Sequence, residues 1–406
     1  MNMKWTTRTL SEVCAIKPPK SEARKRLPEG AMVSFAPMED LGIERKLLNP
    51  SQVRPLDSVI GNYTYFAEGD VLLAKITPCF ENGKLGIADG LMNGIGFGSS
   101  EYFVFRPSSN LDKEFLYYFL SRASFRAEGA ASMTGAVGHK RVSKDFIESY
   151  AIPVPPIAEQ RRIVIVLDEA FEGIATAKAN AEKNLQNARA IFESHLRFVF
   201  AKRGADWLKR PLGELCECIT KGSSPKWQGF SYVKEPGILF VTSENVGEHQ
   251  MLLAEPKYVE EKFNTKNRKS ILKTGDVLTN IVGASIGRTA VFERPVVANI
   301  NQAVCLIRCV PDLMSNFFLA YLLNSPPFKT ILHDNEVNNA RANLSLNFFT
   351  QLLVPIPSLS EQQRIVAQLA ALREKTQRLE SVYEKKLIAL QALENSLLHQ
   401  AFSGAL

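Results

Sequence analysis

The sequence lacks the features that mark metalloproteins, exported proteins and membrane proteins. It has 6 cysteines and 5 histidines in 406 residues, and their spacing matches no metal-binding motif. No apolar segment approaches the roughly 18 residues that cross a bilayer, and the first residues hold no apolar core of signal-peptide length. We therefore expect reduced thiols, no membrane association and a cytoplasmic location.

Catalytic motifs are also missing. Residues 283–289 resemble a phosphate-binding loop, but three rather than four residues separate the two glycines, and Arg288 stands where lysine is required. We expect a hairpin there instead. The chain has no Asn-Pro-Pro-Tyr, no Gly-rich S-adenosylmethionine pattern and no Asp…Glu-x-Lys arrangement of a nuclease. The sequence thus predicts a protein that is not itself an enzyme.

The composition is that of a folded protein with several domains. Hydrophobic residues make up 45% of the chain and charged residues 22%, and 406 residues exceed one ordinary core. The formal net charge of +7 mildly favours a polyanionic partner.

The chain is a tandem repeat. Residues 5–14 and 207–216 share five of ten positions, and both segments begin with tryptophan. The same offset of 202 residues relates residues 153–164 to residues 355–366. Because twice 202 is nearly the whole length, any function must use two similar modules.

A long helical pattern follows each proline-rich break. In the second helix the expected buried positions alternate steps of four and three, with two polar interruptions: Ile365, Leu369, Leu372, Thr376, Leu379, Tyr383, Lys386, Leu390, Leu393 and Leu397. The first helix carries a similar stripe of smaller residues. The heptads favour an antiparallel coiled coil of the two helices, and the alternative is that each helix packs only on its own module.

These patterns predict an α/β (α+β) fold with two pseudo-symmetric mixed modules joined by two long helices. We place the modules at residues 1–155 and 204–357, and the helices at residues 156–203 and 358–406. The segments around residues 69–76 and 275–282 are expected to be equivalent turns that enter strands.

The doubled motif Pro-x-Pro-(x)3-Glu-Gln-x-Arg-Ile-Val, at residues 153–164 and again at 355–366, resembles the specificity subunit of type I restriction-modification systems. The resemblance covers essentially the whole chain. It implies two target recognition domains that each read one half of a bipartite, asymmetric double-stranded DNA site, and a coiled coil that sets their separation. It also implies two methyltransferase subunits as partners, restriction/translocase subunits attached through them, and no cofactor of its own. S-adenosylmethionine, ATP and magnesium are expected on the partner subunits.

DNA contacts need side chains that reach base edges or phosphates, chiefly Arg, Lys, Asn and Gln. The candidates of the first module are Lys20, Arg24, Lys25, Lys84, His139, Lys140 and Arg141. The candidates of the second module are Lys221, Ser223, Lys226, Trp227, Asn280, Arg288, Asn339, Arg341 and Asn343. A charged cluster is more often only a solvated surface. The repeated frame favours DNA for the two paired loops, residues 135–141 and 338–343, but not for each residue in them.

The Glu-Gln-x-Arg segments open both helices. The candidates for a helix–module junction or a subunit interface are Glu159, Gln160, Arg162, Glu361, Gln362 and Arg364. We favour the structural junction, with subunit docking as the alternative. For the whole protein the alternative to DNA recognition is a DNA-independent coiled-coil scaffold that docks two copies of a partner, although such a scaffold has no need of divergent basic and Asn-rich loops.

Overall fold

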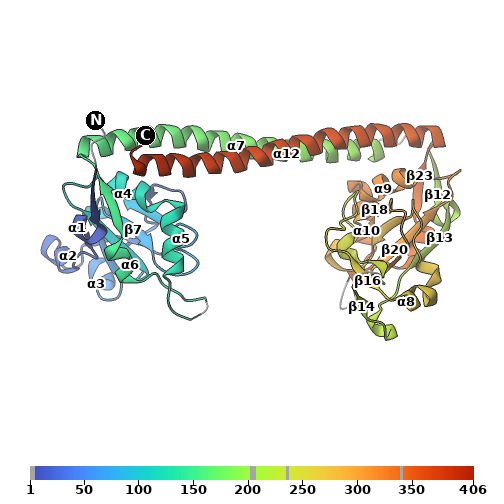
Figure 1. The fold of residues 1–406 in the computed structure, drawn as a ribbon, viewed down its shortest axis with the longest axis horizontal. Coiled ribbons are helices and arrows are strands. Elements are labelled where there is room, and N and C mark those ends of the chain that lie inside the picture. Colours follow the sequence, from blue (N-terminus) through green and yellow to red (C-terminus); the bar gives the residue numbers. More distant parts are fainter. Residues whose placement is uncertain (1–4, 137, 202–206, 235–236, 339–341) are drawn as a thin grey trace. The chain divides into compact units, whose positions relative to one another are not determined.

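The computed structural model describes residues 5–136, 138–201, 207–234, 237–338 and 342–406. The chain forms two compact units: Met1–Ala181 with Lys385–Leu406, and Glu182–Glu384. Each unit holds one mixed module and part of each long helix (Figure 1). The units therefore cut across both helices, whereas our sequence division separates helices from modules.

The first module contains three sheets and several short helices. A two-stranded antiparallel sheet joins the module to its helix: β1 (Thr6–Thr9) and β11 (Ala151–Val154). The five-stranded sheet has the order β2 (Cys14–Ile16), β10 (Tyr102–Pro107), β7 (Val71–Ala74), β8 (Leu85–Ala88) and β4 (Leu47–Leu48). The four-stranded sheet has the order β5 (Gln52–Pro55), β3 (Met32–Ala36), β9 (Ile95–Gly98) and β6 (Thr64–Ala67). The α-helices are α1 (Leu10–Val13), α2 (Ser21–Arg26), α3 (Leu56–Val59), α4 (Lys113–Leu120), α5 (Ala123–Ala131) and α6 (Lys144–Ser149).

The second module repeats this plan. Its junction sheet pairs β12 (Leu208–Pro211) with β23 (Leu353–Ile356). One four-stranded sheet has the order β13 (Cys216–Lys221), β20 (Val304–Cys309), β17 (Val277–Asn280) and β18 (Thr289–Val291). The other has the order β14 (Tyr232–Val233), β16 (Lys257–Val259), β15 (Ile238–Val241) and β19 (Ala298–Ile300). The short pair β21 (Val337–Asn338) and β22 (Ala342–Asn343) and the helices α8 (Glu261–Lys266), α9 (Asn316–Asn324), α10 (Pro326–Asp334) and α11 (Leu346–Gln351) complete it.

A buried ion pair marks the equivalence of the two modules. In the first, Arg106 donates to Asp70 through Nε at 2.7 Å and Nη2 at 2.8 Å. In the second, Arg308 does the same to Asp276, at 2.8 Å for both bonds. Both carboxylates are 1% exposed, and each also accepts a backbone N–H of the turn that precedes β7 or β17. The expected equivalence of these turns is thus confirmed, and Arg106 and Arg308 neutralise the acidic charge that folding buries.

The repeat is not perfect at the first strand of each module. Cys14 faces Pro107 and Cys216 faces Cys309, but a bulge between Cys216 and Cys218 puts one extra residue into β13. A bulge of this kind turns the following side chains to the other face of the sheet. The segments that follow β2 and β13 therefore leave their sheets differently.

The long helices are α7 (Ile157–Ala201) and α12 (Leu359–Ser403). Within the first unit they pair antiparallel, because Arg162 contacts Leu406 and Lys178 contacts Glu394. Within the second unit Arg189 contacts Glu380 and Glu384. The predicted antiparallel coiled coil is confirmed.

The heptad seam predicted for α12 is partly wrong. Ile365 and Leu369 are buried, but Leu379 is 42% exposed and Leu393 is 47% exposed. In the same stretch of α12, Thr376 and Leu398 are buried and Tyr383, Leu387 and Leu390 are half-buried. The covered face of the helix therefore does not include Leu379 and Leu393. A pair of helices covers such side chains on one side only.

Within the described residues, no helix is both long enough and apolar enough to span a bilayer. The same part of the chain holds no group of three or more His, Cys, Asp or Glu side chains that could bind a metal ion.

Candidate nucleic-acid interface

A hairpin-like loop of the first module carries three of the predicted residues. Thr134 pairs with Arg141 across the loop, and Gly135 has a φ of +125° with a carbonyl 2.9 Å from where a Cβ would lie, so only glycine fits. The side chains of His139 and Lys140 are exposed. Figure 1 shows this loop extending from the module beyond α6. The loop thus presents a cationic tip.

Arg141 supports the loop as much as it presents charge. Its guanidinium donates to both carboxylate oxygens of Glu101, at 2.9 and 2.8 Å, although 47% of the side chain stays exposed. This bond holds the pKa of Glu101 below its usual value. The loop is therefore anchored to the residues that precede β10.

Lys17 and Lys75 link the two predicted basic clusters of the first module. Lys75 donates to the Ser100 carbonyl at 2.8 Å, and desolvation lowers its pKa, with smaller contributions from Lys17 and Arg141. Desolvation lowers the pKa of Lys20 too, and Lys17 adds to the effect. Glu101 pairs with both Lys75 and Arg141. Lys17 and Lys75 thus lie near the candidates Lys20 and Arg141, although our candidate list misses both. Their spacing in sequence gives no hint of it, since β2 and β7 meet only through β10.

The other candidates of the first module are placed less favourably. Arg24 and Lys25 are exposed on the short helix α2, and Lys20 donates to the Gly61 carbonyl at 2.8 Å. Lys84 is half-buried and donates to the Met38 carbonyl at 2.7 Å, so its ammonium group is engaged in holding a loop.

A groove in the second module brings together four predicted residues. It has a volume of about 1040 Å³, and the predicted residues that line it are Lys221, Ser223, Trp227 and Asn343. Gln228, Asn301 and Gln302 add amide groups to the same groove. Trp227 is 83% exposed on the turn Lys226–Gln228. An exposed indole beside amides and a lysine suits stacking and polar contacts with a nucleic acid.

Close packing shapes this groove. A Cβ on Gly222 would lie 1.7 Å from the Ile300 carbonyl oxygen, so β13 can pass the end of β19 only with glycine there. The Gly222 amide donates to the Asn301 carbonyl at 3.2 Å. The loop that carries Ser223 and Trp227 is thereby fixed at its first residue.

The two paired loops return to equivalent strand ends. Arg141 bridges Ile76 after β7, and Asn343 bridges Val282 after β17. The next residues repeat the match, because the amide of Val142 donates to the Lys75 carbonyl and that of Leu344 to the Ile281 carbonyl, both at 2.9 Å. The loops thus have one attachment and different sequences. Asn339 and Arg341 lie outside the described residues.

The prediction for Asn280 is wrong. The side chain is fully buried at the end of β17, and its Nδ2 donates to the Ser243 carbonyl at 2.9 Å and to Ser285 Oγ at 3.2 Å. It supports the turn that follows instead of facing a ligand. That turn is the expected hairpin, because β17 and β18 pair antiparallel, and Arg288 is exposed on it.

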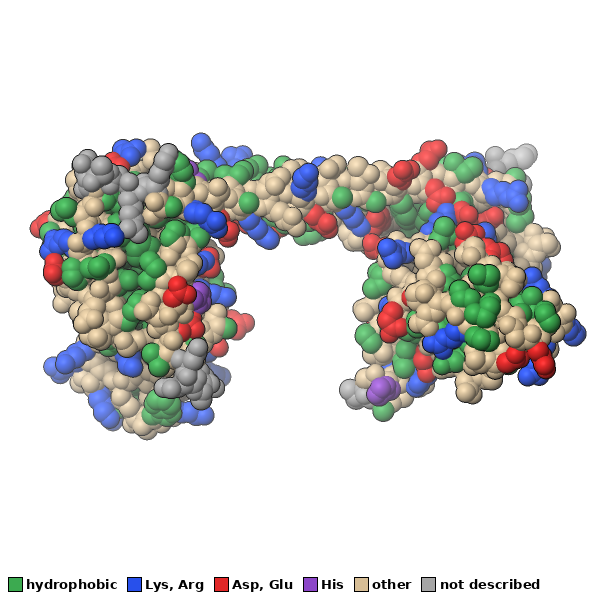
Figure 2. All heavy atoms as spheres, turned by 180° about the vertical axis from the view of Figure 1, so that it is seen from behind, with side chains coloured by type: hydrophobic (Ala, Val, Ile, Leu, Met, Phe, Trp, Pro, Cys, Tyr) green, Lys and Arg blue, Asp and Glu red, His purple; other side chains and the backbone are tan. Residues whose placement is uncertain are grey.

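Both modules carry charged side chains on the face seen in Figure 2. In the view of Figure 2, Lys and Arg side chains occur on the module ends furthest from the helices, interspersed with acidic ones.

Buried glutamines join each module to its helix. Gln160 is fully buried: its Oε1 accepts the Asp112 amide at 2.8 Å, and its Nε2 donates to the carbonyls of Asn110 at 2.9 Å and Pro155 at 2.8 Å. Gln362 makes the equivalent bonds to Ser315, Leu313 and Pro357, at 2.8, 3.1 and 3.1 Å. The geometry fits the structural junction that we favoured for this pair.

The acidic and basic members of the motif lie at the surface. Glu159 and Arg162 form a bidentate ion pair at 2.8 Å, and Glu361 with Arg364 repeats it at 2.7 and 2.6 Å. Each arginine lowers the pKa of its glutamate. Exposed pairs of this kind contribute little to stability, and Arg162 also donates to the Leu406 carbonyl at 2.8 Å.

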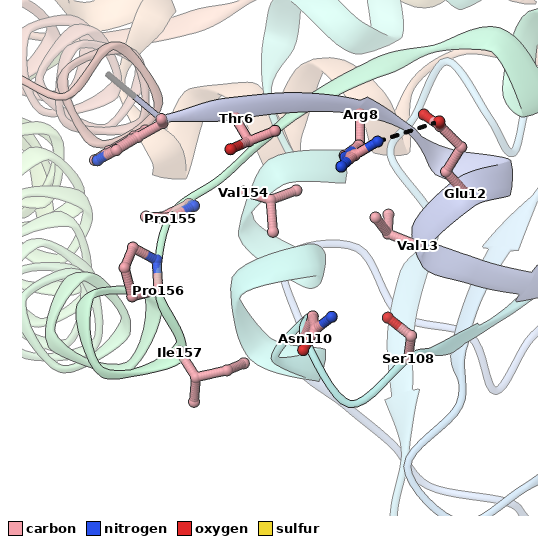
Figure 3. A pocket seen from close by; sticks show the side chains of 11 residues that line it. Thr6, Arg8, Glu12, Val13, Ser108, Asn110, Val154, Pro155, Pro156 and Ile157 are labelled. Carbon is pink, nitrogen blue, oxygen red and sulfur yellow. Dashed lines mark ion pairs between the residues drawn. The ribbon is translucent and has the colours of Figure 1, made fainter. Parts of the chain in front are cut away.

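A pocket of about 800 Å³ lies at the foot of α7 in the first unit. Figure 3 shows Arg8 and Glu12, 3.7 Å apart, across from Pro156 and Ile157. None of the candidates for DNA contact that the structure describes lines it. The pocket therefore belongs to the junction and not to the candidate interface.

The comparison with protein families decides which kind of protein carries this arrangement. A family model described as the type I restriction modification DNA specificity domain matches the chain twice, over residues 2–186 and 204–388. The chain belongs to this specificity family. The two matches confirm the repeat and the suspected resemblance.

Relatives carry the same description. The specificity subunit of the type I restriction enzyme EcoEI from Escherichia coli is 40% identical over 161 residues, which are 39% of this chain and 26% of that protein. The EcoAI subunit from Escherichia coli is 38% identical over 162 residues, 40% of this chain and 27% of that protein. The EcoBI subunit is 24% identical over 294 residues, 67% of this chain and 62% of that protein. The chain thus spans about a quarter of the length of the first two relatives.

Solved structures of the specificity family share the fold. A chain from a study of complex assembly and conformational transition of the type I R-M system gives a TM-score of 0.81 at 20% identity, covering 100% of this chain and 99% of that chain. The HsdS subunit from Thermoanaerobacter tengcongensis gives 0.65 at 20% identity, covering 100% and 98%.

Proposed function

We propose that the chain is a noncatalytic specificity subunit, which binds a bipartite double-stranded DNA site and directs methyltransferase and restriction subunits to it. The observation that carries the proposal is the pair of loops with one attachment and two chemistries. In the first module, the loop that returns to the sheet at Arg141 has a cationic tip. In the second module, Asn343 lies in a groove that Trp227 also lines. Two modules with one frame and different contact surfaces can read two different half-sites.

The chemistry of each surface supports DNA over a small ligand. The first module offers lysine and arginine side chains that suit phosphates, and the second adds amides that can pair with base edges. Both surfaces are open, as a duplex requires. A DNA-independent scaffold would leave these divergent loops without a role.

We propose partner docking along the long helices. Their outer surfaces carry large apolar side chains, among them Ile165 on α7 and Val382 and Ile388 on α12, with exposures of 58%, 52% and 71%. Single-chain packing leaves these groups in water, and a partner would cover them. S-adenosylmethionine, ATP and magnesium belong, in this proposal, to the methyltransferase and restriction subunits.

Methylation mapping tests the function directly. The chain is expressed with its methyltransferase in a host without other adenine methylation, and the modified sites are sequenced. We expect a two-part motif with a fixed gap, present only when both proteins are expressed. Methylation without a sequence restriction, or with a single continuous motif, contradicts the proposal.

A further inference from the structure

Besides the glutamine junction and the apolar core that each module shares with the long helices, each module contacts the helices through one loop. The loop that follows β3, residues 41–46, reaches the helices of the first unit, and the loop that follows β15, residues 247–250, reaches those of the second. Both loops also bond to their own sheets, through the bridge from Ile43 to Lys84 and the bond from the His249 amide to the Thr289 carbonyl. The two loops hold equivalent places in the repeat.

The first loop makes its contact through an ion pair. Lys46 Nζ lies 2.7 and 2.8 Å from the two carboxylate oxygens of Asp168 on α7 and 2.5 Å from Glu114 on α4. Tyr118 also donates to Asp168, and its ring packs edge-on against Phe171 on α7 at 5.4 Å. The lysine side chain is 25% exposed, so the contact is partly shielded from water. This contact ties three elements of the first unit together.

The second loop uses a different set of groups. Arg373 on α12 donates to the His249 carbonyl at 2.7 Å, and the His249 ring lies edge-on to Phe192 on α7 at 5.4 Å. The ring also packs against Tyr321, and its Nδ1 lies 3.2 Å from Nδ2 of Asn324. His249 has a φ of +60°, in the left-handed region that residues other than glycine adopt uncommonly, although histidine does so more often than most. The tip of this loop thus packs between the module and the helices.

We propose that Lys46 in the first unit, and His249 with Arg373 in the second, are positioning residues that hold each module at one angle to its helices. The inference rests on the proposed function, because the angle matters only if both modules must reach one DNA duplex. The two loops hold equivalent places in the repeat but contact the helices through different side chains. Substitutions in one module can therefore change its angle without changing the angle of the other. These residues touch no DNA in this proposal, and they act on the length of the gap that the chain accepts.

A small change in the angle between a module and its helices moves the far end of the module by a distance that matters on DNA. A domain of about 150 residues is roughly 38 Å across. A tilt of about 5° around the glutamine junction therefore moves the far end of a module by about 3.4 Å, the rise of one base pair. The loop contact adds to the shared apolar core in restricting this tilt.

A measurement without DNA tests the positioning itself. Spin labels on p-acetylphenylalanine replace the exposed residues Asp89 and Glu172, one in the first module and one on α7, in the full chain. Lys46→Met keeps the apolar stem and removes the charge, whereas Lys144→Met changes a lysine that pairs only within α6. We expect the distribution of distances between the two labels to widen at least twofold in Lys46→Met. Lys144→Met and Lys46→Arg should both keep the width of the unaltered chain. An unchanged width in folded Lys46→Met overturns the proposal.

The methylation readout then separates positioning from recognition. With Lys46→Met or Arg373→Met we expect at least fivefold more methylation of sites whose gap is one base pair longer or shorter, with both half-site sequences unchanged. Equal loss at all sites, or an unchanged gap preference, overturns the positioning role. Failure of the proposed function looks different, because the unaltered chain then gives no bipartite motif, while the spin-label widths still decide whether these residues fix the module.

Discussion

Replacing Gln160 with leucine should weaken the attachment of the first module to α7. The substitution nearly keeps the side-chain volume and removes all three hydrogen bonds of a fully buried amide, at 2.8, 2.9 and 2.8 Å. It leaves the Asp112 amide and the carbonyls of Asn110 and Pro155 without their partner. The glutamine is therefore more costly to lose than its small size suggests.

The magnitude follows from the number of bonds. A neutral hydrogen bond contributes about 1 kcal/mol net, so three lost bonds destabilise the first unit by about 3 kcal/mol. For a unit of this size each 1 kcal/mol shifts the melting temperature by roughly 2 to 4 °C, which gives a decrease of about 6 to 12 °C. Hydrogen exchange at the Asp112 amide should accelerate by about 150-fold when it proceeds through this opening.

Calorimetry and exchange mass spectrometry on the full chain measure both effects. Gln362→Leu is the twin that should act on the second unit alone, and Glu159→Gln is the surface control, with an expected change of less than about 1 kcal/mol. If Gln160→Leu destabilises the protein no more than Glu159→Gln does, the junction assigned to the glutamines is wrong.

Three further predictions concern other parts of the molecule. Desolvation, with Arg373 and Lys329 adding to it, lowers the pKa of His249 from 6.5 to about 3. The folded second unit should therefore lose stability as the pH falls below 6.5, by about 2 kcal/mol at pH 5. Calorimetry of His249→Asn should show no change of stability with pH over this range, and a pH dependence that persists in this variant refutes the assignment. Asp276→Asn leaves Arg308 without its charge partner and should cost about 3 kcal/mol by denaturant unfolding, whereas a cost below about 1 kcal/mol would mean that the pair is dispensable. Lys140→Gln should lower the slope of log affinity against log salt by about 1 in DNA-binding titrations, and an unchanged slope removes the loop tip from the interface.

The repeat carries most of what the sequence reveals about the fold. The offset between residues 5–14 and 207–216 predicts two modules, and the proline breaks predict where the helices begin. The pattern succeeds because it depends on local periodicity and on two independent copies of one frame. It fails for Leu379 and Leu393, because the covered face of α12 includes Leu387 and Leu398 instead.

The candidate site is predicted less completely. Basic and Asn-rich segments identify the two paired loops, yet composition cannot tell that Asn280 points inward at the end of a buried strand or that Lys84 holds a loop. The proximity of Lys17 and Lys75 to the candidates becomes visible only when distant strands are paired. Loop contacts depend on tertiary structure, and no short motif encodes them.

Exchange of the first module tests the central claim most directly. Residues 1–155 are replaced by the corresponding module of a relative with another target, and the methylated sites are sequenced in cells that carry the same methyltransferase. We predict that one half of the bipartite motif changes, while the other half is retained. A change in both halves, or in neither, contradicts the assignment of one module to one half-site.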